Sequence, residues 1–166
     1  MKRLLLLLSM LGWAGAAAFA NATTTTIAVA ARLLPQVSVS TTSMDFGTWV
    51  AADKIHQSTA TVTVQATAGT AYAMTLDAGQ HYDGVFWRHI QNGATGVPYL
   101  IVDPSNSFLW GDGGFGNTYS AGSAVHGVGS GSPQSFTANG FLFTLYASPA
   151  SPVGTYTDVI TVTVYY

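Results

Sequence analysis

The chain has 166 residues and a formal net charge of −2 at pH 7, with 48% hydrophobic but only 7% charged residues. An ordinary globular chain is about 25% charged. Five Lys and Arg residues cannot build the basic face that nucleic-acid binding requires, and the high hydrophobicity excludes intrinsic disorder. The sequence contains no Glu, which disfavours coiled coils and helical bundles. What remains is a Thr-, Val- and Gly-rich β protein of one domain.

The first twenty residues have the organisation of a secretory signal peptide. Lys2 and Arg3 form a positive region, residues 4–13 are mainly apolar, and Ala18-Phe19-Ala20 forms a small-x-small cleavage site. A membrane anchor, the alternative, needs about 20 apolar residues followed by a polar stop, whereas this run ends in alanines and a Thr string. We therefore expect residues 1–20 to be cleaved before Asn21 and the remaining chain to be exported.

Alternation of apolar and polar residues with a period of two dominates the rest of the chain. The pattern predicts strands over residues 25–33, 45–50, 59–66, 71–76, 85–91, 98–103, 136–146 and 155–166. Gly, Pro, Asn and Asp separate these segments, and no stretch has a convincing helical period. About eight strands with short turns predict an all-β sandwich.

A Gly-rich segment interrupts this pattern between Gly111 and Gly131, with eight glycines among Ser and Asn residues. Glycine lowers the stability of regular elements, so the segment is expected to be a long loop. Long loops are also often functional, which leaves a binding loop as the alternative.

The sequence offers weak candidates for chemistry. A metal site could be imagined from side chains in separate turns, namely His81, Asp83, His89, Asp103 and Asp112. Zinc needs three or four ligands that converge, so ordinary turn residues are the simpler interpretation. Asp112 is expected to cap backbone N–H groups in the turn from Trp110 to Gly113. We expect no metal and no cofactor.

An enzyme is also disfavoured. The chain has no Cys, which excludes thiolate nucleophiles and disulfides. It contains no Gly-x-Ser-x-Gly motif, and without Glu a pair of catalytic carboxylates would require two Asp. Aromatic residues at strand ends and in loops either fill the core ends or stack on sugars. These residues are Trp49, Phe86, Trp87, Trp110, Phe115 and Tyr119.

An ordered set of short motifs covers residues 27–166. The motifs are Met44-Asp45-Phe46-Gly47, Gly69-Thr70-Ala71-Tyr72, Leu76-Asp77-Ala78-Gly79, Arg88-His89-Ile90, residues 98–103, Trp110-Gly111-Asp112-Gly113, and residues 152–166 with Gly154, Tyr156 and Asp158. Together they resemble the spore coat protein U family, which is similar to the pilin subunits of archaic chaperone–usher pili.

The resemblance implies an immunoglobulin-like sandwich that lacks its last strand and is completed by donor-strand complementation. A periplasmic chaperone would lend a strand, and an outer-membrane usher would replace it with the N-terminal segment of the next subunit. Residues 21–34 are the candidate donor, with Ile27, Val29, Ala31 and Leu33 on one face, and residues 35–166 form the sandwich. The acceptor residues would be Ile160, Val162, Val164 and Tyr166 of the terminal strand.

The resemblance therefore implies a structural subunit of a surface fibre that serves adhesion or biofilm formation. The alternatives are a spore or cell coat protein of the same fold and a secreted module that binds carbohydrate or another surface ligand. One departure concerns the disulfide that is common in such pilins: the equivalent places hold Pro35 and Ala66.

Overall fold

The computed structural model describes residues 23–166 and divides the chain into a unit that ends at Leu33 and a second unit from Leu34 to Tyr166. The predicted signal peptide lies outside the described residues. The predicted strand over residues 25–33 is wrong, because residues 23–36 form no regular element. Ile27, Val29 and Leu33 are each more than 80% exposed. A single strand without a partner cannot satisfy its backbone groups, so an apolar row alone does not make a strand.

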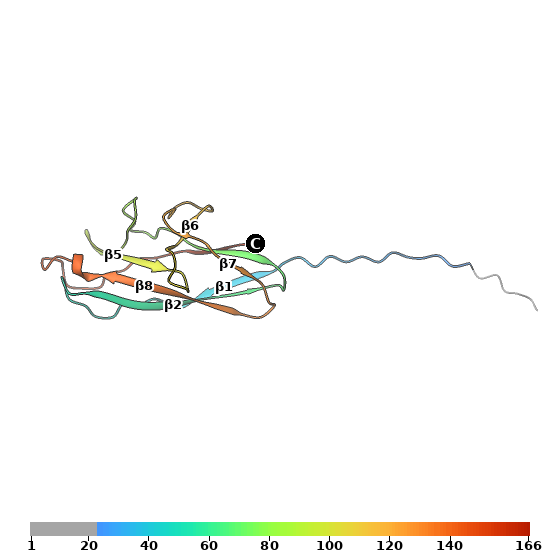
Figure 1. The fold of residues 1–166 in the computed structure, drawn as a ribbon, viewed down its shortest axis with the longest axis horizontal. Helices are drawn as coiled ribbons and strands as arrows, with labels where there is room; N and C mark the ends of the chain where they lie inside the picture. The colour runs from blue at the N-terminus through green and yellow to red at the C-terminus, as the bar shows by residue number, and fades with distance from the viewer. Residues whose placement is uncertain (1–22) are drawn as a thin grey trace, which may run out of the picture. The chain divides into compact units, whose positions relative to one another are not determined.

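The second unit is a β-sandwich (Figure 1). Its elements are β1 (Val37–Thr41), β2 (Ile55–Ala66), β3 (Ala71–Leu76), β4 (Arg88–Asn92), β5 (Thr95–Val102), β6 (Trp110–Gly113), β7 (Val125–Val128), β8 (Gln134–Phe143), the 3-10 helix η1 (Thr144–Tyr146) and β9 (Val162–Tyr165). One sheet has the order β1-β2-β8-β5-β4 and the other has the order β7-β3-β9, with all pairs antiparallel. The predicted all-β sandwich is confirmed. No helix in residues 23–166 is long and apolar enough to cross a membrane.

Several predicted boundaries are wrong for local reasons. The edge strand β1 was not predicted, because its alternation of Val and Ser is short and mostly exposed. Residues 45–50 form no strand, since Asp45 accepts a hydrogen bond from the Gly47 N–H at 2.8 Å and Gly47 has φ of +68°. This local turn breaks the extended backbone. The Gly-rich segment is more ordered than expected, because it contains part of β6 and all of β7.

The core lies between the two sheets and follows the predicted alternation. Its members include Val62, Val64 and Ala66 of β2, Leu76 of β3, Val97, Tyr99 and Ile101 of β5, Ala138 and Leu142 of β8, and Trp110. Trp110 and Tyr119 are fully buried, so for these two aromatics the core-filling alternative is confirmed, whereas Phe86 is 37% exposed.

A buried arginine joins three segments of this core. Arg88 is fully buried and donates hydrogen bonds to the carbonyl oxygens of Leu76, Asp77 and Trp110. Its guanidinium carbon lies 3.7 Å from the ring centroid of Tyr119, so the aromatic face also stabilises the charge. Burial lowers the pKa of Arg88, although neighbouring Tyr and Asp side chains oppose that shift. Arg88 therefore ties β4 to the ends of β3 and to β6.

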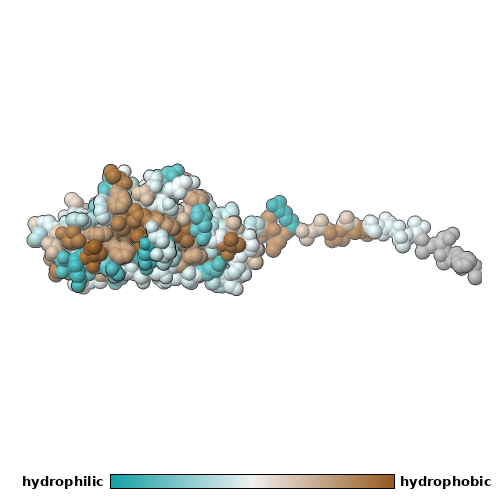
Figure 2. Space-filling model, in the orientation of Figure 1, coloured by the Kyte–Doolittle hydropathy of each residue, from teal (hydrophilic) through white to brown (hydrophobic). Residues whose placement is uncertain are grey.

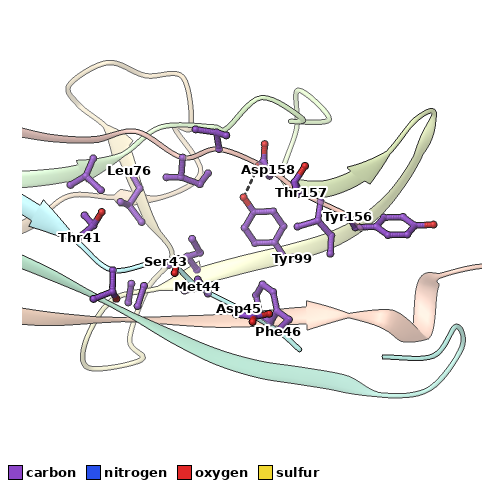
Figure 3. A pocket seen from close by; sticks show the side chains of 18 of the residues that line it. Thr41, Ser43, Met44, Asp45, Phe46, Leu76, Tyr99, Tyr156, Thr157 and Asp158 are labelled. Carbon is purple, nitrogen blue, oxygen red and sulfur yellow. Dashed lines mark hydrogen bonds between the residues drawn. The ribbon is translucent and has the colours of Figure 1, made fainter. Parts of the chain in front are cut away.

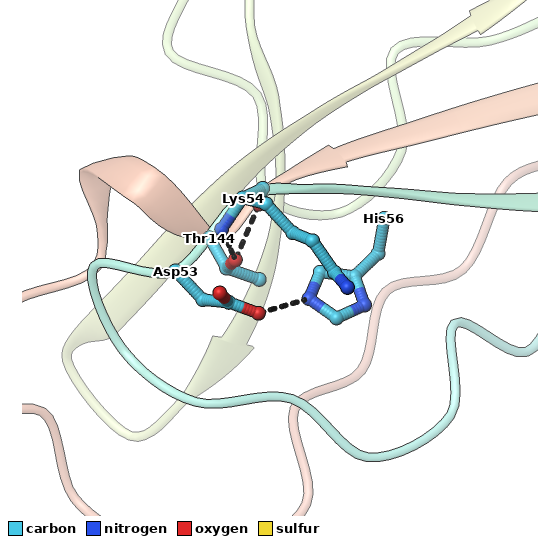
Figure 4. A network of polar contacts seen from close by, with 4 residues as sticks. All are labelled: Asp53, Lys54, His56 and Thr144. Carbon is cyan, nitrogen blue, oxygen red and sulfur yellow. Dashed lines mark hydrogen bonds and ion pairs between the residues drawn. The ribbon is translucent and has the colours of Figure 1, made fainter.

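One end of the sandwich is closed by a polar network around Thr144 (Figure 4). The Ala52 N–H donates to the Thr144 carbonyl oxygen, and the Thr144 hydroxyl donates to the Lys54 carbonyl oxygen at 2.5 Å. The His56 imidazole, at the start of β2, lies 3.4 Å from the carboxylate of Asp53 in the loop before that strand. The network holds the loop before β2 against η1.

Asp112 organises the Gly-rich segment rather than the turn that contains it. Its carboxylate accepts hydrogen bonds from the Thr118 N–H and hydroxyl and from the Tyr119 N–H, at 2.6–2.8 Å. The predicted capping role is confirmed, but the capped groups lie beyond the predicted turn from Trp110 to Gly113. Asp112 is 4% exposed, so these bonds replace water that the carboxylate has lost.

Asp103 caps a second loop in the same way. It accepts hydrogen bonds from the N–H groups of Ser105, Ser107 and Phe108 and from the Ser105 hydroxyl. Burial raises the pKa of this carboxyl, but the hydrogen bonds outweigh burial and the net pKa is lowered. The ionised form is therefore the one that the fold stabilises.

Asp112→Ala is expected to lower the free energy of unfolding by about 2 kcal/mol, because the buried Tyr119 N–H and the Thr118 N–H lose a charged acceptor. Asp45→Ala is the matched control, since Asp45 is exposed and caps only the Gly47 N–H. Asp45→Ala should lower the free energy of unfolding by less than about 1 kcal/mol. Urea unfolding of both variants measures the difference, and equal costs would contradict the role of Asp112.

Stability should fall in acid in part through Asp103. Its folded pKa lies below the unfolded value of about 3.9, so its contribution is complete above that value and is lost as pH falls through the folded pKa. Asp103→Asn should therefore flatten the dependence of unfolding free energy on pH below about pH 4. Urea unfolding between pH 5 and pH 2 tests this, and parallel curves for parent and variant would contradict it.

Candidate strand-acceptor groove

A groove of about 530 Å³ opens between two segments that flank the edge strands. One wall is formed by residues 41–49, which follow β1, and the other by residues 156–162, which lead into β9 (Figure 3). Both β1 and β9 lie at sheet edges. Each therefore has one side without a strand partner in the described structure, and such edges readily pair with another strand.

The floor of the groove is the hydrophobic core itself. Val62, Leu76, Ile101 and Ala138 belong to the core and also line the groove. Ile90 and Tyr99 complete the floor. The core side chains at the floor of the groove are packed on one side but not on the side that faces the groove. An inserted apolar strand would complete their packing.

The wall before β9 is attached to the sandwich on one side only. The Asp77 N–H donates to the Thr161 carbonyl oxygen, and the Thr161 N–H donates to the Asp77 carboxylate. Thr157 exchanges two backbone hydrogen bonds with Gln91 of β4. Between these anchors, residues 158–161 form no strand. The predicted terminal strand is thus shorter than expected, because the segment changes its partner from β4 at Thr157 to the end of β3 at Thr161.

Asp158 fixes the inner face of this wall. Its carboxylate accepts hydrogen bonds from the Gln80 N–H at 2.9 Å and from the Tyr99 hydroxyl at 2.6 Å (Figure 3). Burial raises the pKa of Tyr99, and the bond to Asp158 raises it further, so the phenol stays protonated and continues to donate. Gly79 makes room for the arrangement, because a Cβ atom there would overlap the Asp158 carboxylate.

The opposite wall packs through Met44, Phe46 and Trp49. The Phe46 ring lies 6.3 Å from the Tyr99 ring, and Trp49 meets Tyr156 edge to face at 5.2 Å. The second contact joins the two walls at one end of the groove. The sandwich residue beneath Met44 is Gly140, where a Cβ atom would clash with the Met44 side chain.

The structure distributes the predicted site residues between the groove and its support. Asp45, Phe46, Gly47, Tyr156, Asp158, Ile160 and Val162 line the groove. Val164 packs against the core, and Tyr166 is 67% exposed; neither lines the groove. Asp77, Gly79 and Arg88 support its walls, while Trp110, Gly111, Asp112 and Gly113 belong to β6. Gly154 adopts a φ of +142° before Tyr156.

Met44, Trp49 and Tyr99 also line the groove but are not among the predicted site residues. Met44 and Tyr99 each lie within a motif that the sequence analysis quotes, and the alternation of β5 points Tyr99 inward. The pairing of Trp49 with Tyr156 had no signal in the sequence, because these residues are more than 100 positions apart.

The imagined metal ligands have other contacts. Asp83 accepts hydrogen bonds from the N–H groups of Val85, Phe86 and Trp87. His89 pairs through its backbone with His81. Within residues 23–166, no three His, Asp or Glu side chains converge in a way that could hold a metal ion.

Comparisons with known proteins agree with this architecture. A chain from the crystal structure of the CsuC-CsuE chaperone-tip adhesion subunit pre-assembly complex, from the archaic chaperone-usher Csu pili of Acinetobacter baumannii, matches with a TM-score of 0.56 and 21% identity. The match covers 80% of this chain and 40% of that one. It shows an immunoglobulin-like sandwich as the shared fold. A search of curated proteins finds no match.

A family model gives the assignment. The model for the Spore Coat Protein U domain matches residues 23–163, which include the whole groove and the segment that carries Ile27, Val29, Ala31 and Leu33. The chain belongs to the Spore Coat Protein U domain family.

Proposed function

We propose that this protein is a structural subunit of a surface fibre of the chaperone–usher type, assembled by donor-strand exchange. The observation that carries the proposal is the groove, which opens the hydrophobic core between two sheet edges. The subunit needs no catalytic group or cofactor for this role. Adhesion or biofilm formation would be the activity of the assembled fibre.

The groove and the N-terminal segment are complementary in chemistry. The groove is lined by apolar core residues, and the segment presents Ile27, Val29, Ala31 and Leu33 at alternate positions. Burial of a large aliphatic side chain contributes about 1.5–3 kcal/mol. Strand addition also supplies the backbone hydrogen bonds that the edges lack. Neither gain is available to a chain whose groove stays empty.

The two segments also agree in length. Residues 27–33 and residues 156–162 each span seven positions, or about 20 Å of extended chain. Alternate residues 156, 158, 160 and 162 are partly buried, while residues 157, 159 and 161 are exposed. Opposite residues in a strand pair point to the same face, so four inward donor residues can meet four inward acceptor positions.

The open groove explains the proposed partners. Before assembly, the edges and the exposed core would aggregate, so a periplasmic chaperone is needed to occupy the groove and an outer-membrane usher to exchange its strand for a neighbour's. A cleaved signal peptide at residues 1–20 would deliver the chain to the periplasm. Residues 21–34 serve as donor and residues 35–166 as acceptor.

A coat protein is the second candidate, because the family description names the spore coat. The same groove would then join copies in a layer rather than in a fibre. Electron microscopy of the producing cells distinguishes thin surface fibres from a continuous coat. Binding of carbohydrate by exposed aromatics stays a prediction from the sequence.

Ile27→Asp or Val29→Asp should abolish polymers while the chain still reaches the periplasm, because burying an unpaired charge costs several kcal/mol. Ala28→Asp is the matched control, since alternation places residue 28 on the opposite face. The measurement is the ladder of polymers that resists SDS without boiling. Normal ladders from the two inward variants would refute residues 27–33 as the donor.

A self-complemented chain should be a stable monomer. A second copy of residues 21–34 placed after Tyr166 through a flexible linker would fill the groove of its own domain. We expect higher solubility without a chaperone and a higher melting temperature than the parent. The control carries Ile27→Asp and Val29→Asp in the added copy only. A parent chain that is already monomeric and folds cooperatively alone would contradict the open-groove interpretation.

A further inference from the structure

The donor segment carries one charged residue, and its position offers a way to set the direction of insertion. Within residues 21–35, Arg32 is the only charged residue. It alternates with the apolar row, so it points outward when Leu33 and Ala31 point into a groove. The residue that faces Arg32 across the rim therefore depends on which way the strand runs.

Charged residues in the groove are equally few. Asp45 and Asp158 are the two that line it. Asp158 is partly buried and bonded to Tyr99 and Gln80. Asp45 is exposed and accepts one hydrogen bond, from the Gly47 N–H, and no Lys or Arg of residues 23–166 forms an ion pair with it. Asp45 is thus the acidic group at the rim that an incoming cation can meet.

Contacts place Asp45 along the length of the groove. Its neighbour Phe46 packs against Tyr99, and the Tyr99 hydroxyl bonds to Asp158. Asp45 therefore lies level with residues 157–159. The other end of the groove is marked by Thr41, which pairs with Val62. Figure 3 shows Asp45, Phe46, Tyr156 and Thr157 toward one end and Thr41 and Leu76 toward the other.

The two possible directions place Arg32 at opposite ends. If the donor runs antiparallel to residues 156–162, with Leu33 opposite Tyr156, Arg32 lies opposite Thr157 and within reach of Asp45. If it runs parallel, with Ile27 opposite Tyr156, Arg32 lies opposite Thr161, close to Thr41. In that orientation the acidic residue nearest to Thr161 is Asp77, which does not line the groove. One oxygen of the Asp77 carboxylate already accepts hydrogen bonds from the Thr161 and Gly79 N–H groups.

The attachment point of the segment favours the antiparallel direction. The segment joins the domain at Leu34, just before β1, whose Val37 pairs with Ala66. The end of β9 lies at the same end of the domain, because Tyr165 pairs with Ala73 near the start of β3. The Gly131 and Gly129 N–H groups, which donate to the carbonyl oxygens of Ala66 and Thr70, connect the start of β3 to the end of β2. An antiparallel donor leaves the groove at the Tyr156 end, away from the acceptor's own attachment point. Each copy can then donate and accept at once, as an open head-to-tail fibre requires.

We propose that Arg32 of the incoming subunit pairs with Asp45 at the rim of the acceptor groove and so selects antiparallel insertion in a fixed register. The inference rests on the proposed strand exchange and names a specificity determinant for it. In residues 23–166 the other cations are Lys54 and the buried Arg88. With so few cations competing for Asp45, the charge complementarity is specific.

Cysteine pairs test the placement directly, because the sequence has no Cys of its own. Arg32→Cys with Asp45→Cys should give a disulfide-linked ladder in boiled, non-reduced fibres. Arg32→Cys with Thr41→Cys, the matched control at the other end of the groove, should give monomers. The reverse pattern would overturn the proposed direction. If Ile27→Asp abolishes fibres but neither pair crosslinks, the Arg32 assignment fails and strand exchange stands.

Charge reversal tests whether the Arg32–Asp45 pair contributes to the rate of polymer growth. Arg32→Glu and Asp45→Arg should each slow polymer growth about five-fold at low salt, which is the size expected for an exposed ion pair. The double variant should return to within about two-fold of the parent, and high salt should remove the differences. A double variant as slow as the singles would overturn the pairing. If the parent forms no strand-exchanged polymer, the proposed function itself fails.

Discussion

The structure depends on one constraint: the hydrophobic core is not fully covered by the strands of the two sheets. β1 and β9 are the edges of their sheets, and the groove between their flanking segments reaches Val62, Leu76 and Ile101. Closed sandwiches protect such edges by pairing or by covering them. Here the missing cover is the basis of the proposed function, since a site that binds strands must lack a strand of its own.

An open groove must also be kept from collapsing, and polar contacts do this. Asp158 holds one wall to Tyr99 and Gln80, while Trp49 and Tyr156 fix the distance between the walls at one end. In the absence of Cys, the loops are fixed by carboxylates that accept several N–H groups, as at Asp103 and Asp112. Charged hydrogen bonds of this kind contribute about 1.5–3 kcal/mol each, enough to replace a disulfide between loops.

The sequence was sufficient for the fold class and for the strands that lie in the sheet interior. Alternation in β2, β5 and β8 reflects burial on one face, whereas β3 is buried on both faces and consists mainly of apolar residues. Prediction from the sequence failed where the presence of a pairing partner, rather than the residue pattern, determines whether a segment forms a strand. Residues 25–33 have a strand's pattern but no partner, and β1 has a weak pattern but pairs with β2. The walls of the groove were only partly predicted, since Trp49 meets Tyr156 through tertiary packing alone.

The direction of insertion also distinguishes two possible occupants of the groove: residues 27–33 of a neighbouring copy and residues 27–33 of the same chain. Residues 27–33 are joined to β1 by only three residues, Leu34 to Gln36. A segment folding back into its own groove would run antiparallel to β1 and hence parallel to residues 156–162. Arg32 would then lie near Thr41 and lose Asp45. Insertion from a neighbour keeps the charge pair and avoids a tight reversal at Pro35, so the contact that sets direction also favours assembly over self-closure.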